Sequence, residues 1–380
     1  MEYTYIENQE KLDQAIEAWG APSVISIDLE FDSNRYRYGF NLCLMQIGVG
    51  DHAYLIDPVV NPLDLSRVFT LIEDPKVEKL CYAFGEDHRL LHHLGCVPKN
   101  LYDVKVAASL LDYPPLSLEN ILAEVLDIEP GGSKQKSNWN LRPLKEAQLI
   151  YAASDIAHLS TLKENLAQHE NAVKLNNWIV EENKLYDTLT YSGPVVLPYR
   201  SKDRKDLTQF EWHIYKQILE LREEVAESFN RPGAFIIDKK FLKELAQDTK
   251  LIQEIGRRVK TYRKVDQEDF KKRILDIVLS ADNEAESLGL SKTASASPKY
   301  SKEEYSIFRA KRTRNEEIRK TVYEPIKEEL VKRLGQNAGT YLFSNRVISD
   351  VLEEGIDIIP TYKQLILQNL ADEIGVKLPI

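Results

Sequence analysis

The sequence predicts an α/β domain followed by an all-helical region. Apolar runs with the alternation of β-strands occur only in the first quarter of the chain, and segments with helical spacing lie between and after them. No strong strand pattern follows the connector at 192–203, which contains proline and glycine. Because 380 residues exceed the usual size of one compact domain, we expect two or three domains.

The N-terminal half contains the predicted strands and the helices between them. Strands are expected at 24–31, 43–49, 53–57 and 77–84, and the short connections between the first three favour an antiparallel meander. Helices are expected at 63–74, 86–95, 101–111, 117–126 and 144–166, whereas 131–140 has the composition of a loop. Gly95 is expected to end the second of these helices, and Ser117 to cap the fourth.

The second half contains helical patterns and a linker. Helices are expected at 207–228, after Asp238 as N-cap, and at 266–279, 315–335, 344–354 and 361–374. The segment 281–304 is rich in alanine, serine and glutamate, which predicts a linker between two helical blocks.

Composition indicates an ordinary globular protein. No apolar run reaches the roughly 18–20 residues of a membrane span, and the N-terminus lacks the basic and apolar blocks of a signal peptide. The three cysteines, Cys43, Cys81 and Cys96, are too few and too scattered for a disulfide framework or a zinc ribbon. We therefore expect a cytoplasmic protein with reduced cysteines and no membrane contact.

The net charge of −10 is unevenly distributed along the chain. Residues 1–198 hold 16 Lys/Arg and 29 Asp/Glu, residues 199–280 hold 19 and 15, and residues 281–380 hold 15 and 16. This balance argues against a protein that coats nucleic acid by charge alone, but it permits an enzyme that meets phosphate through metal ions. We expect the basic helical part to hold a polyanionic substrate.

Several acidic residues lie at spacings that bring carboxylates together. Asp28 and Glu30 share one face of a predicted strand, and Tyr151 and Asp155 share one face of a predicted helix. Asp87 opens the helix that follows the fourth predicted strand. Each feature alone has an ordinary explanation. The strand pair could be solvated acids of an edge strand, the helix pair could lie on the surface, and Asp87 could simply complement the helix dipole. Together they fit a two-metal site for phosphodiester cleavage, which needs several carboxylates and a group that orients water.

These residues resemble the DEDD superfamily of exonucleases in its tyrosine-bearing branch, and ribonuclease D within it. The first motif is Asp28-Leu29-Glu30-Phe31, followed by NLCLMQI at 41–47. The second is YAFGED, ending in Asp87, and the third is YAASD at 151–155, preceded by WNLRPL at 139–144 and by Gln148. The likeness spans about 5–170. It departs at Tyr82, where many relatives have histidine, and at Val104, where threonine is usual.

The helical part is similar to HRDC modules, which bind nucleic acid. Residues 207–246 carry the pattern, and 305–376 match it loosely as a divergent second copy. The resemblances together imply a ribonuclease H-like (DnaQ-like) α/β exonuclease fold with a mixed sheet, followed by all-α HRDC-type domains. They also imply the domain limits, which are an exonuclease domain at 1–192, HRDC domain 1 at 204–282, a linker at 283–304 and an HRDC-like domain 2 at 305–380.

The resemblance also implies an activity and its machinery. The chain would be a 3′–5′ exoribonuclease that releases nucleoside 5′-monophosphates, with transfer RNA precursors as expected substrates and no evident protein partner. Two divalent cations, Mg²⁺ or Mn²⁺, would be held by Asp28, Glu30, Asp87 and Asp155, and Tyr151 would position the attacking water. Asp103 is a rival to Asp87 that we rank as structural.

Several alternatives remain open from the sequence. A DNA-directed exonuclease like the one fused to Werner-type helicases has the same motifs, and a non-catalytic RNA-binding scaffold is a further class. His88 and His92, four apart on a helix, are a weak candidate for zinc. Basic side chains that could contact phosphate, or lie in solvated loops, are Lys134, Lys136, Arg142, Arg257, Arg258, Lys260 and Arg263, with Tyr262 and Lys264 beside the last four.

Overall fold

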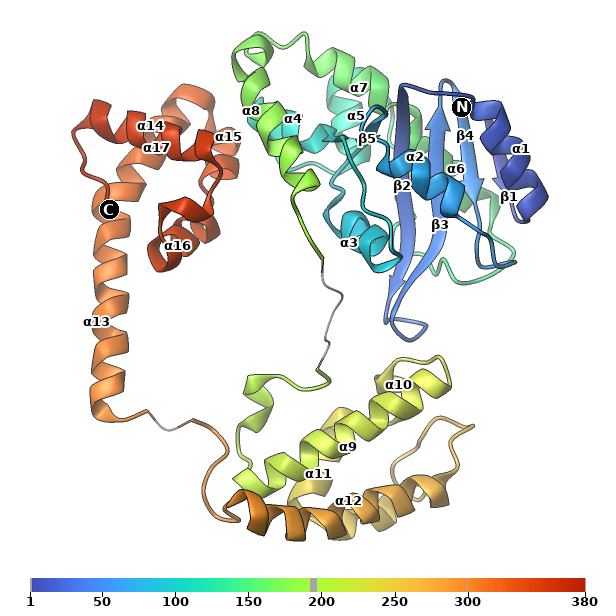
Figure 1. Ribbon diagram of the computed structural model, residues 1–380, viewed down its shortest axis with the longest axis vertical. Coiled ribbons are helices and arrows are strands. Elements are labelled where there is room, and N and C mark those ends of the chain that lie inside the picture. Colours follow the sequence, from blue (N-terminus) through green and yellow to red (C-terminus); the bar gives the residue numbers. More distant parts are fainter. Residues whose placement is uncertain (1, 192–196, 299, 380) are drawn as a thin grey trace. The chain divides into compact units, whose positions relative to one another are not determined.

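The computed structural model describes residues 2–191, 197–298 and 300–379, and these form two compact units (Figure 1). The first unit combines residues 1–30, 42–193 and 302–380, and the second combines 31–41 and 194–301. The chain thus enters the second unit briefly at 31–41, returns to the first, builds the rest of the second, and returns to the first again. Of the expected connector at 192–203, residues 192–196 lie outside the described residues.

A six-stranded mixed sheet is the centre of the first unit. Its strands are β1 (Glu2–Ile6), β2 (Val24–Ser33), β3 (Phe40–Val49), β4 (His52–Ile56), β5 (Glu78–Cys81) and β6 (Leu101–Asp103). Their order is β1-β4-β3-β2-β5-β6. β3 pairs with β4 in antiparallel fashion, whereas β1–β4, β2–β5 and β5–β6 are parallel pairs. The expected meander is confirmed for β3 and β4, and the parallel pairs make the sheet mixed as predicted.

Helices cover both faces of the sheet. The helices of this part are α1 (Gln9–Trp19), α2 (Ser66–Glu73), α3 (Gly85–His93), α4 (Val104–Leu110), α5 (Leu118–Leu126), α6 (Glu146–Ala157), α7 (Leu159–Leu166) and α8 (Ala172–Lys184). Ala152, Ala153 and Ile156 of α6 pack on Leu44 and Leu55 of the sheet, and α1 and α2 lie against the opposite face (Figure 1).

The C-terminal helices complete the hydrophobic core of this same unit. They are α13 (Lys302–Ile318), α14 (Glu324–Leu334), α15 (Gln336–Leu342), α16 (Asn345–Glu354) and α17 (Thr361–Ile374). Leu330 and Leu367 from this part are buried in one cluster with Leu110, Leu162 and Ile179 of the exonuclease-like part. Burial of this kind contributes roughly 1.5–3 kcal/mol for each large aliphatic side chain. Residues 302–380 are therefore built into the first unit.

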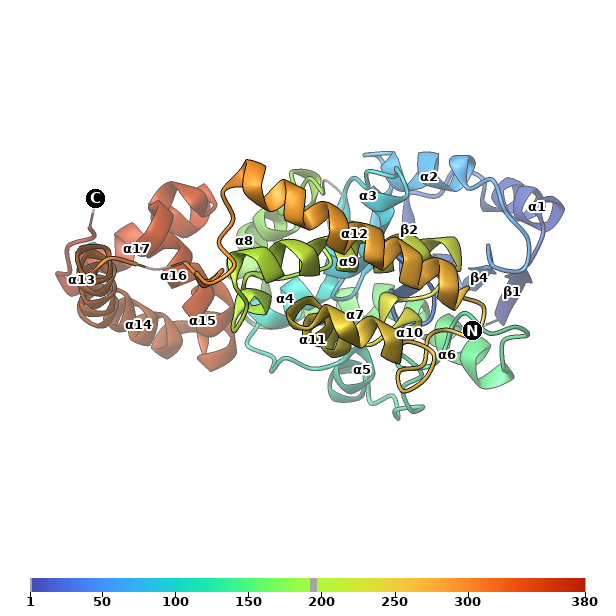
Figure 2. The same ribbon diagram turned by 90° about the horizontal axis from the view of Figure 1, so that it is seen from below.

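The second unit is an all-helical bundle. Its helices are α9 (Gln209–Ser228), α10 (Gly233–Ile236), α11 (Lys239–Gln247) and α12 (Gln267–Leu288). α9 and α12 lie side by side (Figure 2) and bury Ile218, Leu242 and Ile274 in a common core. The carboxylate of Asp238 accepts a hydrogen bond from the Phe241 N–H at 2.9 Å, which confirms it as the N-cap of α11.

Some expected elements differ from the structure. Residues 101–111 were expected as one helix, but they form the three-residue strand β6 and then α4. The expected helix at 144–166 is divided into α6 and α7 at His158, whose ψ of 8° leaves the helical region. The expected linker 281–304 begins as the last turns of α12. β1, α1, α8 and α15 were not expected. Within the part of the chain that the structure describes, no helix is both long and apolar enough to span a membrane.

Candidate metal centre

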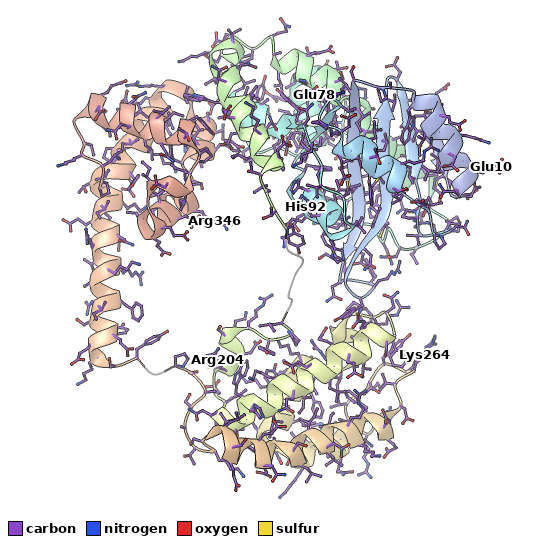
Figure 3. All side chains as sticks on the ribbon, in the orientation of Figure 1. Glu10, Glu78, His92, Arg204, Lys264 and Arg346 are labelled. Carbon is purple, nitrogen blue, oxygen red and sulfur yellow. The ribbon has the colours of Figure 1, made fainter. Side chains whose placement is uncertain are left out.

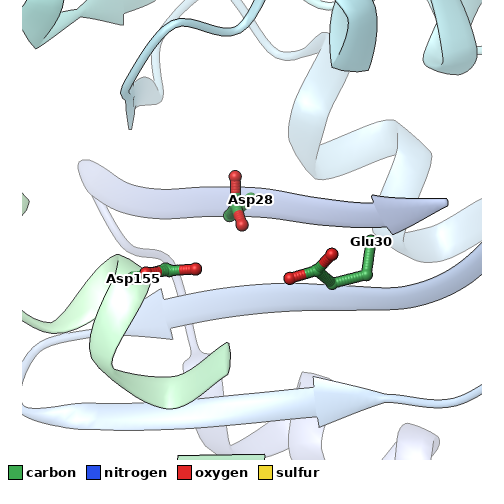
Figure 4. Close-up of side chains that lie close together, drawn as sticks. All are labelled: Asp28, Glu30 and Asp155. Carbon is green, nitrogen blue, oxygen red and sulfur yellow. The ribbon is translucent and has the colours of Figure 1, made fainter. Parts of the chain in front are cut away.

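Two of the predicted carboxylates project from the central strand β2. The side chains of Ile25, Ile27 and Leu29 alternate with Asp28 and Glu30, so the apolar residues enter the core on one face. Glu30 is only 7% exposed and Asp28 is partly buried. The alternation that marks β2 as a strand therefore also places both acids together on its other face (Figure 4).

Asp155 faces these two acids from helix α6. One carboxylate oxygen from each of Asp28, Glu30 and Asp155 lies within 4.8 Å of the others. Figure 4 shows Asp155 approaching the strand from the adjacent helical turn. Among the described residues, this is the one group of three or more acidic, histidine or cysteine side chains close enough to share an ion. The structure thus brings together residues from two elements more than 120 positions apart in sequence.

Asp87 lies at the edge of this cluster, in the first turn of α3. It is buried, and its charge contributes to raising the pKa of Glu30, although its oxygens fall outside the group of three. The turn before α3 contains Ala83 at a φ of 60°, a left-handed conformation that is costly for alanine. Asp103 stabilises this turn, because its carboxylate accepts hydrogen bonds from the N–H groups of Ala83 and Phe84 at 2.8 and 3.1 Å.

Asp103 has further structural contacts. Its carboxylate also accepts hydrogen bonds from the Lys105 N–H at 2.9 Å and from the Tyr186 hydroxyl at 2.8 Å. Four hydrogen bonds use the acceptor capacity of a carboxylate. The structure therefore supports the interpretation that Asp103 positions the start of α3 and does not bind a metal.

Burial and mutual repulsion raise the pKa values of the clustered acids. Burial raises the pKa of Asp28 to about 7, and burial together with the charge of Asp28 raises the pKa of Asp155 to about 8. The pKa of Glu30 is raised to about 10, first by burial and then by the charges of Asp28, Asp155 and Asp87. Burial and the Asp28 charge also raise the pKa of Asp87 well above its usual range. Crowded carboxylates of this kind favour either protonation or a bound cation.

Among the residues that the structure describes, no protein cation compensates these acids. In the described ranges, no lysine, arginine or histidine forms an ion pair with Asp28, Glu30, Asp87 or Asp155. Buried carboxylates without an ion pair are costly unless they coordinate a metal. Oxygen-only ligands are the donors that magnesium and manganese prefer. The chemistry of the donor set therefore fits a hard divalent cation.

Tyr151 lies one helical turn before Asp155 and contacts it. The Tyr151 side chain lies near Asp155 and near Ser133 of the 131–140 loop, and both residues affect the pKa of its hydroxyl. Burial and the charges of Asp155 and Glu30 raise the pKa of Tyr151 far above its ordinary value. The phenol therefore stays protonated in the metal-free protein, and it can orient a water molecule but is a poor general base there.

Arg142 is not available for a phosphate. Its guanidinium forms an ion pair with the fully buried Asp57 and donates to the carbonyl oxygens of Cys43, Trp139 and Leu141 at 2.7–2.8 Å. All five of its N–H groups are engaged in these bonds. The expectation that Arg142 contacts substrate is therefore corrected, because this residue fixes the 139–144 segment to the sheet.

The other basic candidates are solvent-accessible. Lys136 is exposed and Lys134 is partly exposed in the loop whose Ser133 reaches Tyr151. The second unit carries Arg257, Arg258, Lys260, Arg263 and Lys264, all exposed, in the segment before α12. Figure 3 shows Lys264 projecting from this segment.

The histidine pair has the environment of core residues. His88 is buried, its ring lies 4.4 Å from that of His92, and its Nε2 is 3.1 Å from the Tyr186 carbonyl oxygen. Burial and the neighbouring His92 lower the pKa of His88 to about 4. A neutral, packed histidine explains the spacing without zinc. The cysteines Cys43, Cys81 and Cys96 are buried, and none of them forms a disulfide among the described residues.

Comparisons with known proteins agree with this geometry. Residues 3–169 match the family model described as 3′-5′ exonuclease. Ribonuclease D of Bartonella henselae is 28% identical over 225 residues, which cover 58% of this chain and 55% of that protein. Ribonuclease D of a Shewanella species is 30% identical over 254 residues, which cover 64% of each chain. The chain therefore spans less than two thirds of the length of these relatives.

A solved structure extends the likeness in fold to the helical part. The crystal structure of Escherichia coli RNase D, described as an exoribonuclease involved in structured RNA processing, matches with a TM-score of 0.68. The match covers 98% of this chain and 99% of that chain at 21% sequence identity. The expected α/β exonuclease fold with a mixed sheet and a following helical region is confirmed.

Proposed function

We propose that this chain, whose N-terminal part is a 3′–5′ exonuclease domain related to ribonuclease D, hydrolyses RNA from its 3′ end to nucleoside 5′-monophosphates. The observation that carries the proposal is the cluster of Asp28, Glu30 and Asp155 within 4.8 Å, with no protein cation beside it among the described residues. Such a cluster suits phosphodiester hydrolysis, in which cations bridge the protein's carboxylates and the substrate's phosphate.

Asp28, Glu30, Asp87 and Asp155 would hold two divalent cations, Mg²⁺ or Mn²⁺. When bound, the cations would lower the pKa of water and stabilise negative charge on the phosphate and the leaving 3′-oxygen. The chain's own contribution is to keep these carboxylates pre-oriented. Strand β2 holds Asp28 and Glu30 in position. The turn at Ala83 and Phe84, whose N–H groups donate to the Asp103 carboxylate, holds the start of α3 and therefore Asp87.

Tyr151 would position the attacking water. Its side chain lies near Asp155 and near Ser133 of the 131–140 loop, and both residues affect its pKa. Because its pKa is raised, the phenol keeps its proton and can both donate and accept a hydrogen bond. This role aligns the water without transferring a proton to the protein.

The substrate would be RNA, with transfer RNA precursors as the class that the resemblance suggests. The helical second unit would act as an HRDC-type module that holds the RNA body, using Arg257, Arg258, Lys260 and Arg263. Lys134 and Lys136 would contact phosphates near the reacting end. A polyanion is repelled by the acidic catalytic part, so a basic module compensates for that repulsion.

The test uses the full-length protein, a 3′-extended transfer RNA and a DNA strand of matched sequence. Asp155→Asn should reduce RNA hydrolysis in Mg²⁺ by several orders of magnitude, and chelator should abolish hydrolysis by the native chain. Removing one carboxylate from the crowded site should slightly raise the melting temperature of the metal-free protein. Near-native activity of Asp155→Asn would refute the site, and faster hydrolysis of DNA would favour the Werner-type alternative.

A matched control lies on the same helix. Glu146→Gln also converts a carboxylate of α6 to an amide, but Glu146 is exposed and contacts only the Tyr3 hydroxyl at 3.0 Å in the hydrogen bonds recorded for it. This variant should hydrolyse RNA at the native rate, which separates the loss of the site from a general effect on α6.

A further inference from the structure

Helix α13 exposes an unusual number of apolar side chains. None of its residues is buried, and Tyr305, Ile307 and Phe308 are 64%, 68% and 56% exposed. Exposed apolar side chains gathered on one element often mark a binding surface, whereas scattered ones are normal. Because two of the three are aromatic, the helix offers flat rings to a ligand.

The same helix carries a dense run of positive charge. Between residues 305 and 315 the sequence contains Arg309, Lys311, Arg312 and Arg314 and no acidic residue. In the described part of the chain, Lys311, Arg312 and Arg314 are exposed and have no acidic side chain within 4.0 Å. The net charge of residues 281–380 as a whole is close to zero, so this basic run does not show in that sum. The basic side chains are therefore free to meet an external anion.

Two open grooves flank α13. One, of about 640 Å³, lies between α13 and α16, and its lining includes Phe308, Lys311, Arg312, Leu352 and Glu353. Arg319 and Lys320 are neutralised there by Glu324 and Glu316 at 3.5 and 3.9 Å. The other, of about 610 Å³, has an apolar floor including Ile307, Ile318 and Val351, with Lys311 and Arg314 as its charged lining.

We propose that α13 and its two grooves, hereafter the α13 surface, bind single-stranded RNA. Lys311, Arg312 and Arg314 contact phosphates, and the rings of Tyr305 and Phe308 stack on unpaired bases. A surface that pairs cations with aromatic rings is the combination that binds single strands without sequence preference. The inference deepens the proposed function by giving a second place, inside the first unit, where the substrate is held.

Charge complementarity favours RNA over a protein partner. A protein ligand for this surface would have to be acidic, whereas RNA offers both phosphates for the cations and bases for the exposed rings of Tyr305 and Phe308. The exposed rings also favour a single strand over a duplex, because paired bases cannot stack on them. A second copy of the chain would bring equal positive charges together at the surface, which is unfavourable.

The test measures binding of fluorescent poly(A) to the full-length chain in chelator, so that no hydrolysis occurs. The triple variant Lys311→Gln, Arg312→Gln, Arg314→Gln should bind about tenfold more weakly at low salt. Its plot of log K against log salt should be shallower by about 2, since each single-strand phosphate contact contributes roughly 0.7. Phe308→Ala should weaken poly(A) binding about fivefold or more and a poly(A)–poly(U) duplex much less.

The control is a second triple variant, Lys332→Gln, Arg346→Gln, Lys377→Gln, which removes the same charge from exposed positions in the same C-terminal part. It should bind poly(A) nearly as the native chain does. Equal losses in the two triple variants would overturn the proposal, since the effect would then be total charge. A native dimer that dissociates in the Phe308→Ala variant would also overturn it, because the surface would serve self-association.

A short substrate separates this inference from the proposed function. Hydrolysis of the trinucleotide ApApA in Mg²⁺ requires the carboxylates. The trinucleotide is too short to span both the carboxylate cluster and the α13 surface. The α13 triple variant should hydrolyse ApApA at the native rate. If the native chain fails to hydrolyse ApApA, the proposed activity is wrong, while the poly(A) binding measurement still decides the α13 surface.

Discussion

At the scale of single residues, Tyr151 gives the sharpest test of the proposed chemistry. Its hydroxyl contacts Asp155, and its raised pKa keeps it protonated. Tyr151→Phe should lower kcat about 10²-fold or more, the usual scale for a group that handles a proton or its water. Metal affinity, measured by calorimetry, should remain nearly native. A parallel loss of metal binding would mean that Tyr151 is a ligand instead.

The pKa values of the acids predict how metal binding depends on pH. In the metal-free protein, burial raises the pKa of Asp28 from 3.8 to about 7 and that of Asp155 to about 8. The folded state then binds more protons than the unfolded state across this window, so these groups make the free energy of unfolding fall as pH rises from about 4 to about 8.

Metal binding should therefore release protons from the site, and affinity for Mn²⁺ should rise with pH, steeply up to about 8 and further up to about 10 as Glu30 also loses its proton. Calorimetric titrations at pH 6.5 in two buffers of different ionisation enthalpy will count the protons. We expect at least one proton released per protein at that pH and clearly fewer at pH 9. A binding heat that is independent of the buffer at pH 6.5 would contradict the raised pKa values.

The residues of the site differ in how far the sequence reveals them. Asp28 with Glu30, and Tyr151 with Asp155, are visible because each pair lies within one element, where strand or helix periodicity fixes the shared face. Arg142 was misassigned because its partner, Asp57, lies 85 positions away and contributes no local pattern. The hydrogen bonds of Asp103 to Ala83 and Tyr186 are equally non-local, so they emerge only from the fold.

At the scale of elements, a buried ion pair joins α8 to the C-terminal helices. Glu182 of α8 and Lys363 of α17 are 8% and 7% exposed, and their charged atoms are 2.9 Å apart. The hydroxyl groups of Tyr341 and Tyr362 also donate to the Glu182 carboxylate. Four polar groups are thereby satisfied at the junction between α8 and the C-terminal helices.

Glu182→Ala should destabilise the protein by about 3–5 kcal/mol, because it leaves the Lys363 ammonium buried without a partner. Adding Lys363→Met to that variant should recover much of the loss, since the double change removes both charges. Urea denaturation of the two variants will show the difference. Equal stability of the single and double variants would mean that water replaces the carboxylate and that the pair does not fix the junction.

The boundaries of elements were harder to predict than their existence. Leu101, Val104 and Leu111 follow helical spacings of three and seven residues, so the sequence hides the strand β6, whose pairing with β5 comes from distant residues. The alternation around Asp28 is local and strong, and β2 was placed within two residues of its observed end. Whether a short segment forms a strand depends on its pairing partners in the sheet, and a local sequence pattern does not reveal those partners.

At the scale of the whole molecule, the path of the chain changes how the helical part can be tested. Ending the chain near residue 200 would remove the basic second unit, but it would also remove helices whose Leu330 and Leu367 belong to the apolar core of the first unit. We expect that truncated form to be poorly folded by circular dichroism. Replacing 197–301 with a flexible Gly/Ser linker should instead preserve the first unit's near-native melting temperature.

The linker variant should raise KM for a structured RNA far more than it lowers kcat, because the basic second unit would hold the RNA body. Hydrolysis of a short oligonucleotide should change little. Neutralising Arg257, Arg258 and Lys260 in the full chain should reproduce part of the KM defect. A folded linker variant with native KM for structured RNA would show that the second unit serves another purpose.

The return of residues 302–380 to the first unit also affects the order of events on the ribosome. The sheet and its helices are synthesised first, yet their core lacks Leu330, Leu367 and the Lys363 partner of Glu182 until residue 367 has been added. The second unit has its own core and is released earlier. The nascent sheet and its helices therefore wait with apolar surface uncovered, and we expect arrest-peptide profiles to register their folding force only after residue 370 leaves the exit tunnel. Translation thus completes the inserted second unit before it completes the unit into which it is inserted.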